Sequence, residues 1–305
     1  MKIEYVLPEK ALTNEMLASI YDGWTAEKIY SKTGIKERRI ADDSISAIDL
    51  AESAAKRLFE SHAIDSQSVD FLLLCTQSSI HRLPSSSCVL QDRLGLKQSI
   101  GTLTIDHGCS GFVYGLSVAK GLLSAGIASR VLLITAETYS KYIDQNDRST
   151  RTIFGDGAAA TLIDSTDLPR IGNFVFGTDG SGGDKLMVKD GRLYMDGPEI
   201  FNFTLEVVPR SIDKVLAANG IGMENIDLFV FHQANKFMLD AIRKVCALPR
   251  EKFYVNLEGT GNTVSSTIPI ALKQLSDGGH LKDGMRIMLI GFGVGLSWGA
   301  TIVEN

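Results

Sequence analysis

The feature of this sequence that most constrains its fold is an internal repeat, in which landmarks of the first half recur in the second at a nearly constant offset. The runs "SVDFLLLCTQSS" and "NIDLFVFHQAN" each place an aspartate before a β-prone apolar stretch, and these aspartates, Asp70 and Asp227, are 157 positions apart. The runs "SRVLLITAET" and "MRIMLIGFG" form a second pair, in which Arg130 and Arg286 are 156 positions apart. Self-similarity at a fixed offset indicates repeated structural units.

A third pair of segments lies between the first two in each half and is typical of a glycine- or asparagine-containing turn followed by a helix. "CSGFVYGLSVAKGLLSAG" starts at Cys109, and "NTVSSTIPIALKQLSDGG" starts at Asn262, 153 positions later. No low-complexity linker separates the two halves. The sequence therefore predicts an N-terminal half over residues 1–165 and a C-terminal half over residues 166–305, packed as one pseudo-symmetric body with a site at the seam.

Four apolar runs predict the strands of a layered α/β fold. "FLLLC", "VLLIT", "LFVFH" and "IMLIGF" are continuous rather than alternating, as in strands that are covered on both faces. Gly126 and Gly220 stand where the residue after a helix C-terminus belongs. Helices are expected between these strands and around them, over residues 47–62, 88–96, 111–126, 205–220, 236–248 and 267–279.

The composition excludes several classes of protein. The chain has 305 residues, of which 44% are hydrophobic and 22% charged, as in an ordinary globular protein. Its net charge of −5 argues against a general affinity for nucleic acid. The N-terminus lacks the apolar core of a signal peptide, and no run approaches the about 18 apolar residues of a membrane span. We therefore expect a cytoplasmic protein with neither a nucleic-acid partner nor a membrane partner.

Cys109 is the strongest candidate for a nucleophile among the four cysteines, whose spacings match no metal or redox motif. It stands where a β-prone run gives way to a helical pattern, so it is expected to see the positive end of that helix, which favours thiolate. The glycines at 108 and 111 allow close approach of another backbone or of a substrate. Cys75 and Cys246 are expected in the core, and Cys88 starts a helix without neighbouring glycines.

A nucleophilic cysteine usually has a histidine partner, and His232 is the best placed of the five histidines. It ends a buried run, and the ends of buried strands are where α/β sites form; the alternative is a hydrogen-bonded core histidine. His107 is near Cys109 in sequence, but the glycine between them is expected to turn it away. Asn262 occupies the position that corresponds to Cys109 in the second half, and its alternative role is that of a helix N-cap.

Six motifs together resemble the β-ketoacyl-acyl-carrier-protein synthase III family, which has the thiolase fold. They are "TGIKERRIA", "GCSGFVYGL", "NDRSTRTIFGDGAAA", "FHQAN", "GTGNT" and "GFGVGLSWGA", in the family's order and over nearly the whole chain. The resemblance implies an α/β fold of two duplicated halves in five α-β-α-β-α layers. It also implies a decarboxylative Claisen condensation of an acyl-CoA primer with malonyl-carrier protein, which gives a 3-ketoacyl thioester.

The same resemblance implies a role for each matched residue. Cys109 would carry the acyl group, and the backbone N–H groups of Cys109 and Val294 would form the oxyanion hole. His232 and Asn262 would donate hydrogen bonds to the malonyl thioester carbonyl. No metal or other cofactor is implied, since the CoA thioesters are themselves substrates, and the implied partners are acyl-CoA, malonyl-acyl carrier protein and a second copy of the chain in a homodimer.

Positions around this centre are also implied by the resemblance, several with unusual residues. Lys28 stands where the family often has a tryptophan, with Trp24 one helical turn earlier, and Phe237 replaces an arginine that is associated with carrier-protein docking. The implied peripheral residues are Lys28, Lys36 and Arg148 for CoA or phosphopantetheine, Leu83 as a gate between the acyl pocket and the partner subunit, and Lys236, Arg243 and Lys244 for carrier-protein docking.

Two alternatives to this reaction follow from the sequence. An acyltransferase on the same scaffold would keep the acyl-Cys109 step but pass the acyl group to an alcohol, amine or thiol without decarboxylation, and the departures at Lys28 and Phe237 favour it. A non-catalytic binding or scaffold protein is the third class, against which the complete set of Cys109, His232 and Asn262 argues.

Overall fold

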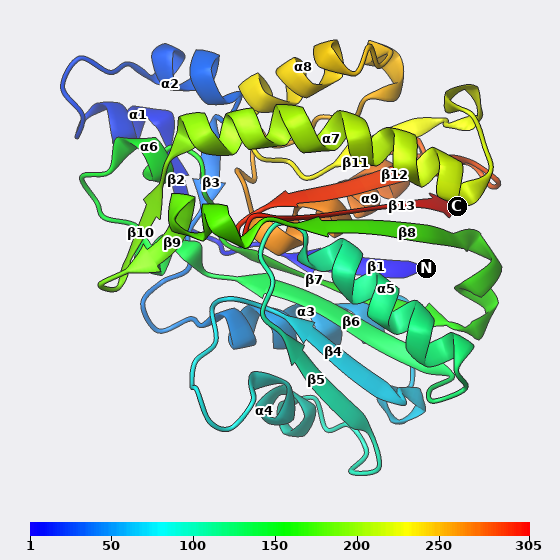
Figure 1. Ribbon diagram of the computed structural model, residues 1–305. Helices are drawn as coiled ribbons and strands as arrows, with labels where there is room; N and C mark the ends of the chain where they lie inside the picture. Colours follow the sequence, from blue (N-terminus) through cyan, green and yellow to red (C-terminus); the bar gives the residue numbers. More distant parts are fainter.

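Two buried sheets with the same strand order form the centre of the computed structural model, which describes all 305 residues (Figure 1). In each sheet a parallel pair of strands is followed by two antiparallel neighbours. The first sheet runs β5 (Gly101–Ile105), β4 (Phe71–Cys75), β6 (Arg130–Glu137), β7 (Gly157–Asp164) and β1 (Lys2–Val6). The second runs β11 (Leu228–Phe231), β12 (Arg286–Gly293), β13 (Ser297–Glu304) and β8 (Ile171–Thr178).

The repeat seen in the sequence is thus a repeat of topology, with one element reduced. The counterpart of β5 in the second half is a single parallel bridge between Phe229 and Phe253. The expected boundary between residues 165 and 166 lies at the 3-10 turn η3 (Ser165–Arg170), which joins β7 to β8.

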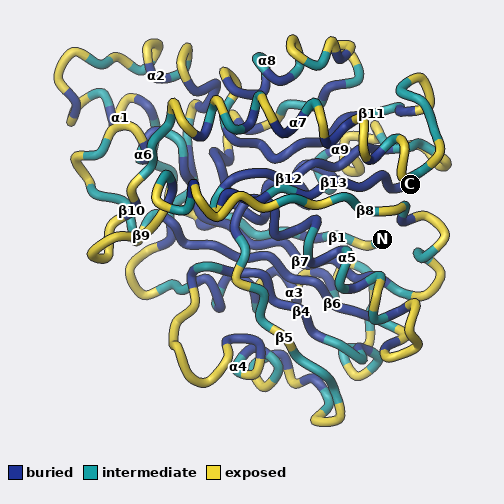
Figure 2. The backbone as a smooth tube through the Cα atoms, viewed as in Figure 1, coloured by how far each residue is buried: buried dark blue, intermediate teal, exposed yellow.

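Three helical layers enclose and separate the sheets, which gives the five α-β-α-β-α layers that the resemblance implies. The middle layer consists of α5 (Gly111–Ser124) and α9 (Thr267–Asp277), whose apolar side chains pack against both sheets. The outer layers are α3 (Ala47–Ser61) with α4 (Ser86–Arg93), and α7 (Gly197–Asn219) with α8 (Lys236–Val245). Figure 2 shows the central strands β4, β6, β7, β12 and β13 as mostly buried, whereas β5 and β8 at the sheet edges are partly exposed.

The six predicted helices all exist, and the largest difference is in α7, which begins eight residues before the expected residue 205. Asp196 starts it by accepting a hydrogen bond from the Glu199 N–H, and a proline occupies the first turn, where its missing N–H costs nothing. Gly126 and Gly220 have φ of 67° and 64°, as expected after a helix end. The structure also contains short helices and strands that were not predicted: β2 (Ala11–Thr13), α1 (Asn14–Ala18), α2 (Ala26–Thr33), β3 (Glu37–Arg39), α6 (Arg148–Arg151), β9 (Leu186–Lys189) and β10 (Arg192–Met195).

No helix in the structure combines the length and the apolar character needed to cross a membrane.

The backbones of the two halves are in close contact where the start of α5 rests on β12. A Cβ atom added to Gly291 would lie 2.8 Å from the Ser110 Cα and 2.9 Å from the Cys109 carbonyl oxygen, so only glycine permits this approach of two backbones. The hydroxyls of Ser110 and Ser297 are 2.8 Å apart across the same contact. The position of Cys109 is therefore set by a strand of the other half.

We predict that Gly291→Ala lowers the free energy of unfolding by about 1–3 kcal/mol, because the new methyl group meets backbone that cannot move independently. The matched control is Gly121→Ala in α5, where an added Cβ has no neighbour within 4 Å. That change is expected to raise stability by up to about 1 kcal/mol, through helix propensity. Denaturant unfolding measures both, and equal stability of the two variants would contradict this account of the seam.

Candidate active site

Cys109 lies between β5 and α5, almost fully buried, with the N-terminal end of α5 immediately after it. The N–H groups of Cys109 itself and of Val294 are directed at its sulfur and lower its pKa, but burial outweighs them. Desolvation first, and then the negative charge of Glu137, raises the pKa of the thiol to about 12. The low thiol pKa expected from the helix end is therefore wrong for this cavity, and the resting sulfur is protonated.

His232 follows the last residue of β11, and its N–H continues the sheet by donating to the Ile290 carbonyl at 2.8 Å. Its ring is buried edge-on to Phe292, with the centroids 5.4 Å apart, and its Nδ1 is 2.7 Å from Thr267 Oγ1. Burial lowers the pKa of His232 to about 3, so the imidazole is neutral at physiological pH. It can donate one hydrogen bond without carrying a charge.

Asn262 is not the helix N-cap that its sequence position allowed, since the N-caps of η7 (Val264–Ser266) and α9 are Thr263 and Ser266. Its Oδ1 instead accepts the Val264 N–H at 2.8 Å within the loop before η7, and this bond leaves the Nδ2 amide free to face the cavity. That Nδ2 lies 3.4 Å from His232 Nε2. The loop itself is held by hydrogen bonds to the segment Ile153–Gly155 of the other half.

The three side chains share one cavity of about 110 Å³, as the sequence analysis predicted for a site at the seam. A Cβ on Gly293 would lie 3.0 Å from Cys109 Sγ, so this glycine lets the Gly293–Val294 backbone approach the sulfur. The remaining wall is mainly apolar, made of Ile153, Phe154, Leu186, Met195, Ile200, Ala234, Met238 and Phe292, with Gly197 and Asn235. The cavity therefore holds few polar groups besides the three predicted ones.

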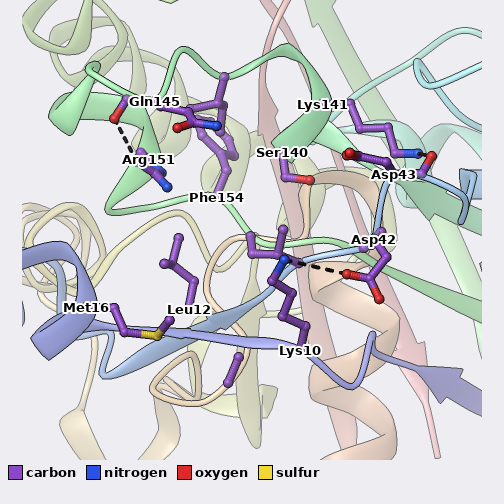
Figure 3. Close-up of a pocket in the computed structure, with 14 residues that line it drawn as sticks. Lys10, Leu12, Met16, Asp42, Asp43, Ser140, Lys141, Gln145, Arg151 and Phe154 are labelled. Atoms are coloured by element: carbon purple, nitrogen blue, oxygen red, sulfur yellow. Dashed lines mark hydrogen bonds and ion pairs between the residues drawn. The ribbon is translucent and has the colours of Figure 1, made fainter. Parts of the chain in front are cut away.

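A larger cavity, of about 380 Å³, lies elsewhere in the molecule and contains none of these three groups (Figure 3). It lies between β2, the segment after β3 and the segment that carries Ser140 and Gln145. Its charged residues are largely engaged with one another, as in the Lys10–Asp42 pair at 3.5 Å. Only Phe154 lines both cavities, so chemistry rather than size identifies the reaction site.

Two of the three residues predicted to bind CoA converge on Trp24. The Nζ of Lys28 and the Cζ of Arg148 lie 5.3 and 5.5 Å from the centre of its ring, and Lys32 joins them at 5.9 Å. Lys36 is not part of this group, since its Nζ is paired with Glu258 at 2.9 Å. Trp24 was noted in the sequence, but its contact with Arg148 was not predicted, because that contact depends on how α2 and α6 pack.

The residues predicted to dock a carrier protein lie on or beside α8. Lys236 is paired with Asp240 at 2.6 Å, whereas Arg243 donates to the Leu248 carbonyl and Lys244 is exposed. Lys236 and Arg243 also line a surface cleft of about 310 Å³.

Leu83, the predicted gate, lies outside the cavity of its own chain. It is 87% exposed, which is unusual for a leucine, and no wall of the Cys109 cavity includes it. Phe237, which replaces the expected arginine, is also exposed and stacks on Phe201 with the ring centroids 5.3 Å apart.

Glu137 is the buried group beside the site that the sequence analysis missed. Its carboxylate accepts hydrogen bonds from the Gln77 N–H, the Ser78 hydroxyl at 2.7 Å and the Ser265 hydroxyl at 3.2 Å. Desolvation raises its pKa to about 8. A glutamate that ends the apolar run "VLLITAE" is the signal that was available, because a buried acid requires partners.

Of the two cysteines expected in the core, Cys246 is only half-buried, because it lies at the end of α8 near the surface. Cys75 is buried and donates from Sγ to the His107 carbonyl at 3.1 Å. The His107 ring packs on Tyr114, with the centroids 4.2 Å apart, and does not line the cavity. Cys88 is exposed. Neither His107 nor Cys88 is therefore a candidate for catalysis.

Comparison with known proteins places this fold and site in the thiolase superfamily. Residues 103–180 match the family model "3-Oxoacyl-[acyl-carrier-protein (ACP)] synthase III", and residues 216–305 match its C-terminal counterpart. Beta-ketoacyl-[acyl-carrier-protein] synthase III 1 of Bacillus anthracis is 37% identical over 299 residues, which are 98% of this chain and 96% of that protein. The chain belongs to the 3-oxoacyl-[acyl-carrier-protein] synthase III family.

Solved structures agree over the whole chain. A 3-oxoacyl-(acyl-carrier-protein) synthase III crystal structure is 50% identical, with a TM-score of 0.97 over 99% of this chain and 98% of that one. The synthase III of Thermus thermophilus is 34% identical, with a TM-score of 0.93 over 99% and 98%. The priming beta-ketosynthase of the R1128 polyketide pathway is 29% identical, with a TM-score of 0.92 over 99% and 94%.

We predict that Glu137→Gln makes Cys109 react faster with iodoacetamide above pH 8. In that range the Glu137 carboxylate is ionised and raises the pKa of the thiol, so its removal leaves more thiolate at a given pH. The expected gain at pH 9 is about threefold to tenfold, and it should vanish below about pH 7, where the carboxyl group is already neutral. Mass spectrometry of the Cys109 peptide measures the rate, and the exposed Cys88 is the internal control. A slower reaction at pH 9 would contradict the assigned charge effect.

Proposed function

We propose that this chain condenses an acyl-CoA primer with malonyl-carrier protein, with loss of CO2, and that Cys109 carries the acyl group between the two steps. The observation that carries the proposal is the single cavity in which a thiol from one half meets an imidazole and a carboxamide from the other. The relatives named above support the reaction by their names. Neither step changes the oxidation state of a bound group, so the proposed chemistry uses no redox cofactor.

In the first step Cys109 Sγ attacks the carbonyl carbon of the acyl-CoA thioester. The bond from that carbon to the CoA sulfur breaks, and the proton of the Cys109 thiol ends on the departing CoA thiol. The N–H groups of Cys109 and Val294, which are directed at the sulfur in the resting state, are placed to bind the oxyanion that forms next to it. One such donor contributes typically about 3 kcal/mol to the transition state.

In the second step the malonyl thioester occupies the space left by CoA, with its carbonyl oxygen between His232 and Asn262. The 3.4 Å between His232 Nε2 and Asn262 Nδ2 allows both nitrogens to reach one oxygen. Loss of CO2 places negative charge on that oxygen, so the two hydrogen bonds strengthen as the charge develops. The enolate carbon then attacks the acyl-Cys109 carbonyl carbon, and the Cys109 sulfur leaves as a thiolate, which takes up one proton from solvent to restore the resting thiol.

The entrance for CoA is proposed at Trp24, Lys28, Lys32 and Arg148. An indole ring and three cations within 5.9 Å of its centre offer both a stacking surface and phosphate ligands, which is the combination that a nucleotide with phosphates requires. In this proposal the Trp24 indole stacks on the nucleotide, as a tryptophan at position 28 would. Lys36, which is paired with Glu258, is at most a secondary contact in this proposal.

A homodimer is proposed because the first sheet ends in an unpaired strand. β5 is the edge of its sheet, and an exposed edge is a template for pairing with another chain. Leu103 on that strand is 45% exposed. In such a dimer the exposed Leu83 would reach the acyl end of the partner's cavity.

Carrier-protein docking is proposed at Lys236, Arg243 and Lys244, because Asn235 and Met238 of the same segment line the cavity.

We predict that Cys109→Ala abolishes the acyl-enzyme, whereas Asn262→Ala leaves acylation within about twofold and lowers condensation by about 100-fold to 1,000-fold. Asn262→Asp is the matched variant, because it keeps the oxygen that accepts the Val264 N–H but loses the donor. Intact-protein mass after exposure to acyl-CoA reports acylation, and CO2 release from malonyl-carrier protein reports condensation. Equal loss of acylation in the Cys109 and Asn262 variants would refute the division of roles, and absence of CO2 release across several primers would refute the reaction.

We predict that Trp24→Ala and Arg148→Ala each raise KM for acyl-CoA by about fivefold to twentyfold, with little change in kcat, since each removes about 1–2 kcal/mol of uniform binding. The matched substrate is the corresponding acyl-pantetheine, which lacks the nucleotide, and its kinetics should be unaffected. Lys36→Ala is the control variant and should stay within about twofold of the wild type. An equal rise in KM for acyl-CoA and acyl-pantetheine would show that the Trp24 group does not bind the nucleotide.

A further inference from the structure

The only hydrogen-bonding side chain at His232 Nδ1 is Thr267, whose Oγ1 lies 2.7 Å away. Both residues are buried. Thr267 is the first residue of α9, and its β-branched side chain has few rotamers in a helix. The hydroxyl is therefore held against the ring by the backbone of the helix itself.

The hydrogen of the Thr267 hydroxyl has two possible acceptors, His232 Nδ1 and the Val264 carbonyl at 3.1 Å. That carbonyl already accepts the Thr267 N–H, which closes the 3-10 turn η7 (Val264–Ser266). Its hydrogen-bonding requirement is met without the hydroxyl. The imidazole nitrogen has no other donor, and it is the nearer of the two acceptors. The hydroxyl hydrogen is thus assigned to Nδ1.

This assignment determines the opposite side of the ring. A neutral imidazole carries one proton, so a ring that accepts at Nδ1 carries its proton on Nε2. Asn262 is oriented in the same sense, because its Oδ1 is occupied by the Val264 N–H and its Nδ2 faces the cavity. The 3.4 Å between Asn262 Nδ2 and His232 Nε2 would be a hydrogen bond from Nδ2 in the opposite tautomer, but it is longer than the roughly 2.7–3.2 Å that is typical of such a bond. With the proton on Nε2, two N–H donors converge there with no acceptor between them. Such a pair is arranged in advance for one shared oxygen that gains negative charge.

We propose that Thr267 is a positioning residue that selects the Nε2–H tautomer of His232. The inference rests on the proposed function in one respect, since the donor matters only if a thioester oxygen binds between His232 and Asn262. Without the hydroxyl, the ring is free to carry its proton on Nδ1. The bare Nε2 lone pair would then face the enolate oxygen and repel it. Acylation of Cys109 does not use this donor and is independent of the tautomer.

The test compares Thr267→Val, which keeps the shape and removes the hydroxyl, with Thr267→Ser, which keeps the hydroxyl. Enzyme labelled with 15N-histidine reports by NMR which ring nitrogen of His232 is protonated, with His232→Asn as the assignment control. We expect protonated Nε2 in the wild type and in Thr267→Ser, and a shift towards protonated Nδ1 in Thr267→Val. Condensation should fall by about 100-fold in Thr267→Val and stay within about threefold of the wild type in Thr267→Ser. Acylation by acyl-CoA should be unchanged in both.

A wild-type ring protonated on Nδ1 would overturn the proposal, and so would a Thr267→Val enzyme that condenses as fast as the wild type. Equal loss of acylation and condensation in Thr267→Val would also overturn it, because that result indicates a structural role. The spectrum of the wild-type enzyme decides the tautomer even if Thr267→Val does not fold. Failure of the proposed function is recognised separately, since the wild type would then release no CO2 while the NMR result still stands.

Discussion

The removal of water from the seam between the two halves is the constraint on which the rest of the site depends. Because the first turn of α5 rests on β12 at Gly291, Cys109 sits where neither half alone would enclose it. Desolvation there raises the pKa of the thiol and lowers that of His232. The same dry environment strengthens every N–H that faces the cavity. A neutral imidazole, a neutral thiol and a few oriented donors are the consequence.

Buried polar groups hold this arrangement together across the seam. Glu137 of the first half accepts the Ser265 hydroxyl of the second, and Ser265 belongs to the turn between Asn262 and Thr267. Thr267 in turn contacts His232. One network therefore connects the strand that ends in Glu137 with Asn262 and His232. Trp24, just before α2, and Arg148 of α6 come from separate parts of the chain, so their aromatic–cation contact forms only in the tertiary structure.

The sequence alone was sufficient for the fold class and for the three central residues. Continuous apolar runs indicate strands covered on both faces, and their recurrence about 156 positions later indicates duplication, because both patterns are local and follow from burial. Cys109, His232 and Asn262 were proposed because His232 follows such a run, Cys109 and Asn262 occupy corresponding turns of the two halves, and all three lie within motifs that the family shares. Glu137 was missed although it ends the same kind of run, since its hydrogen-bonding partners come from two distant segments, Gln77–Ser78 and Ser265.

What only the tertiary structure decided is the environment of each group. The turn before α5 correctly located Cys109, but the expected low thiol pKa was wrong, because burial by β12 and the charge of Glu137 outweigh the helix end and neither is visible in the local sequence. The exclusion of Lys36 from the Trp24 group and the contact of Thr267 with His232 depend on packing in the same way. Sequence specifies which chemical groups exist and in what local geometry, whereas desolvation and proton placement depend on neighbours that folding brings from far along the chain.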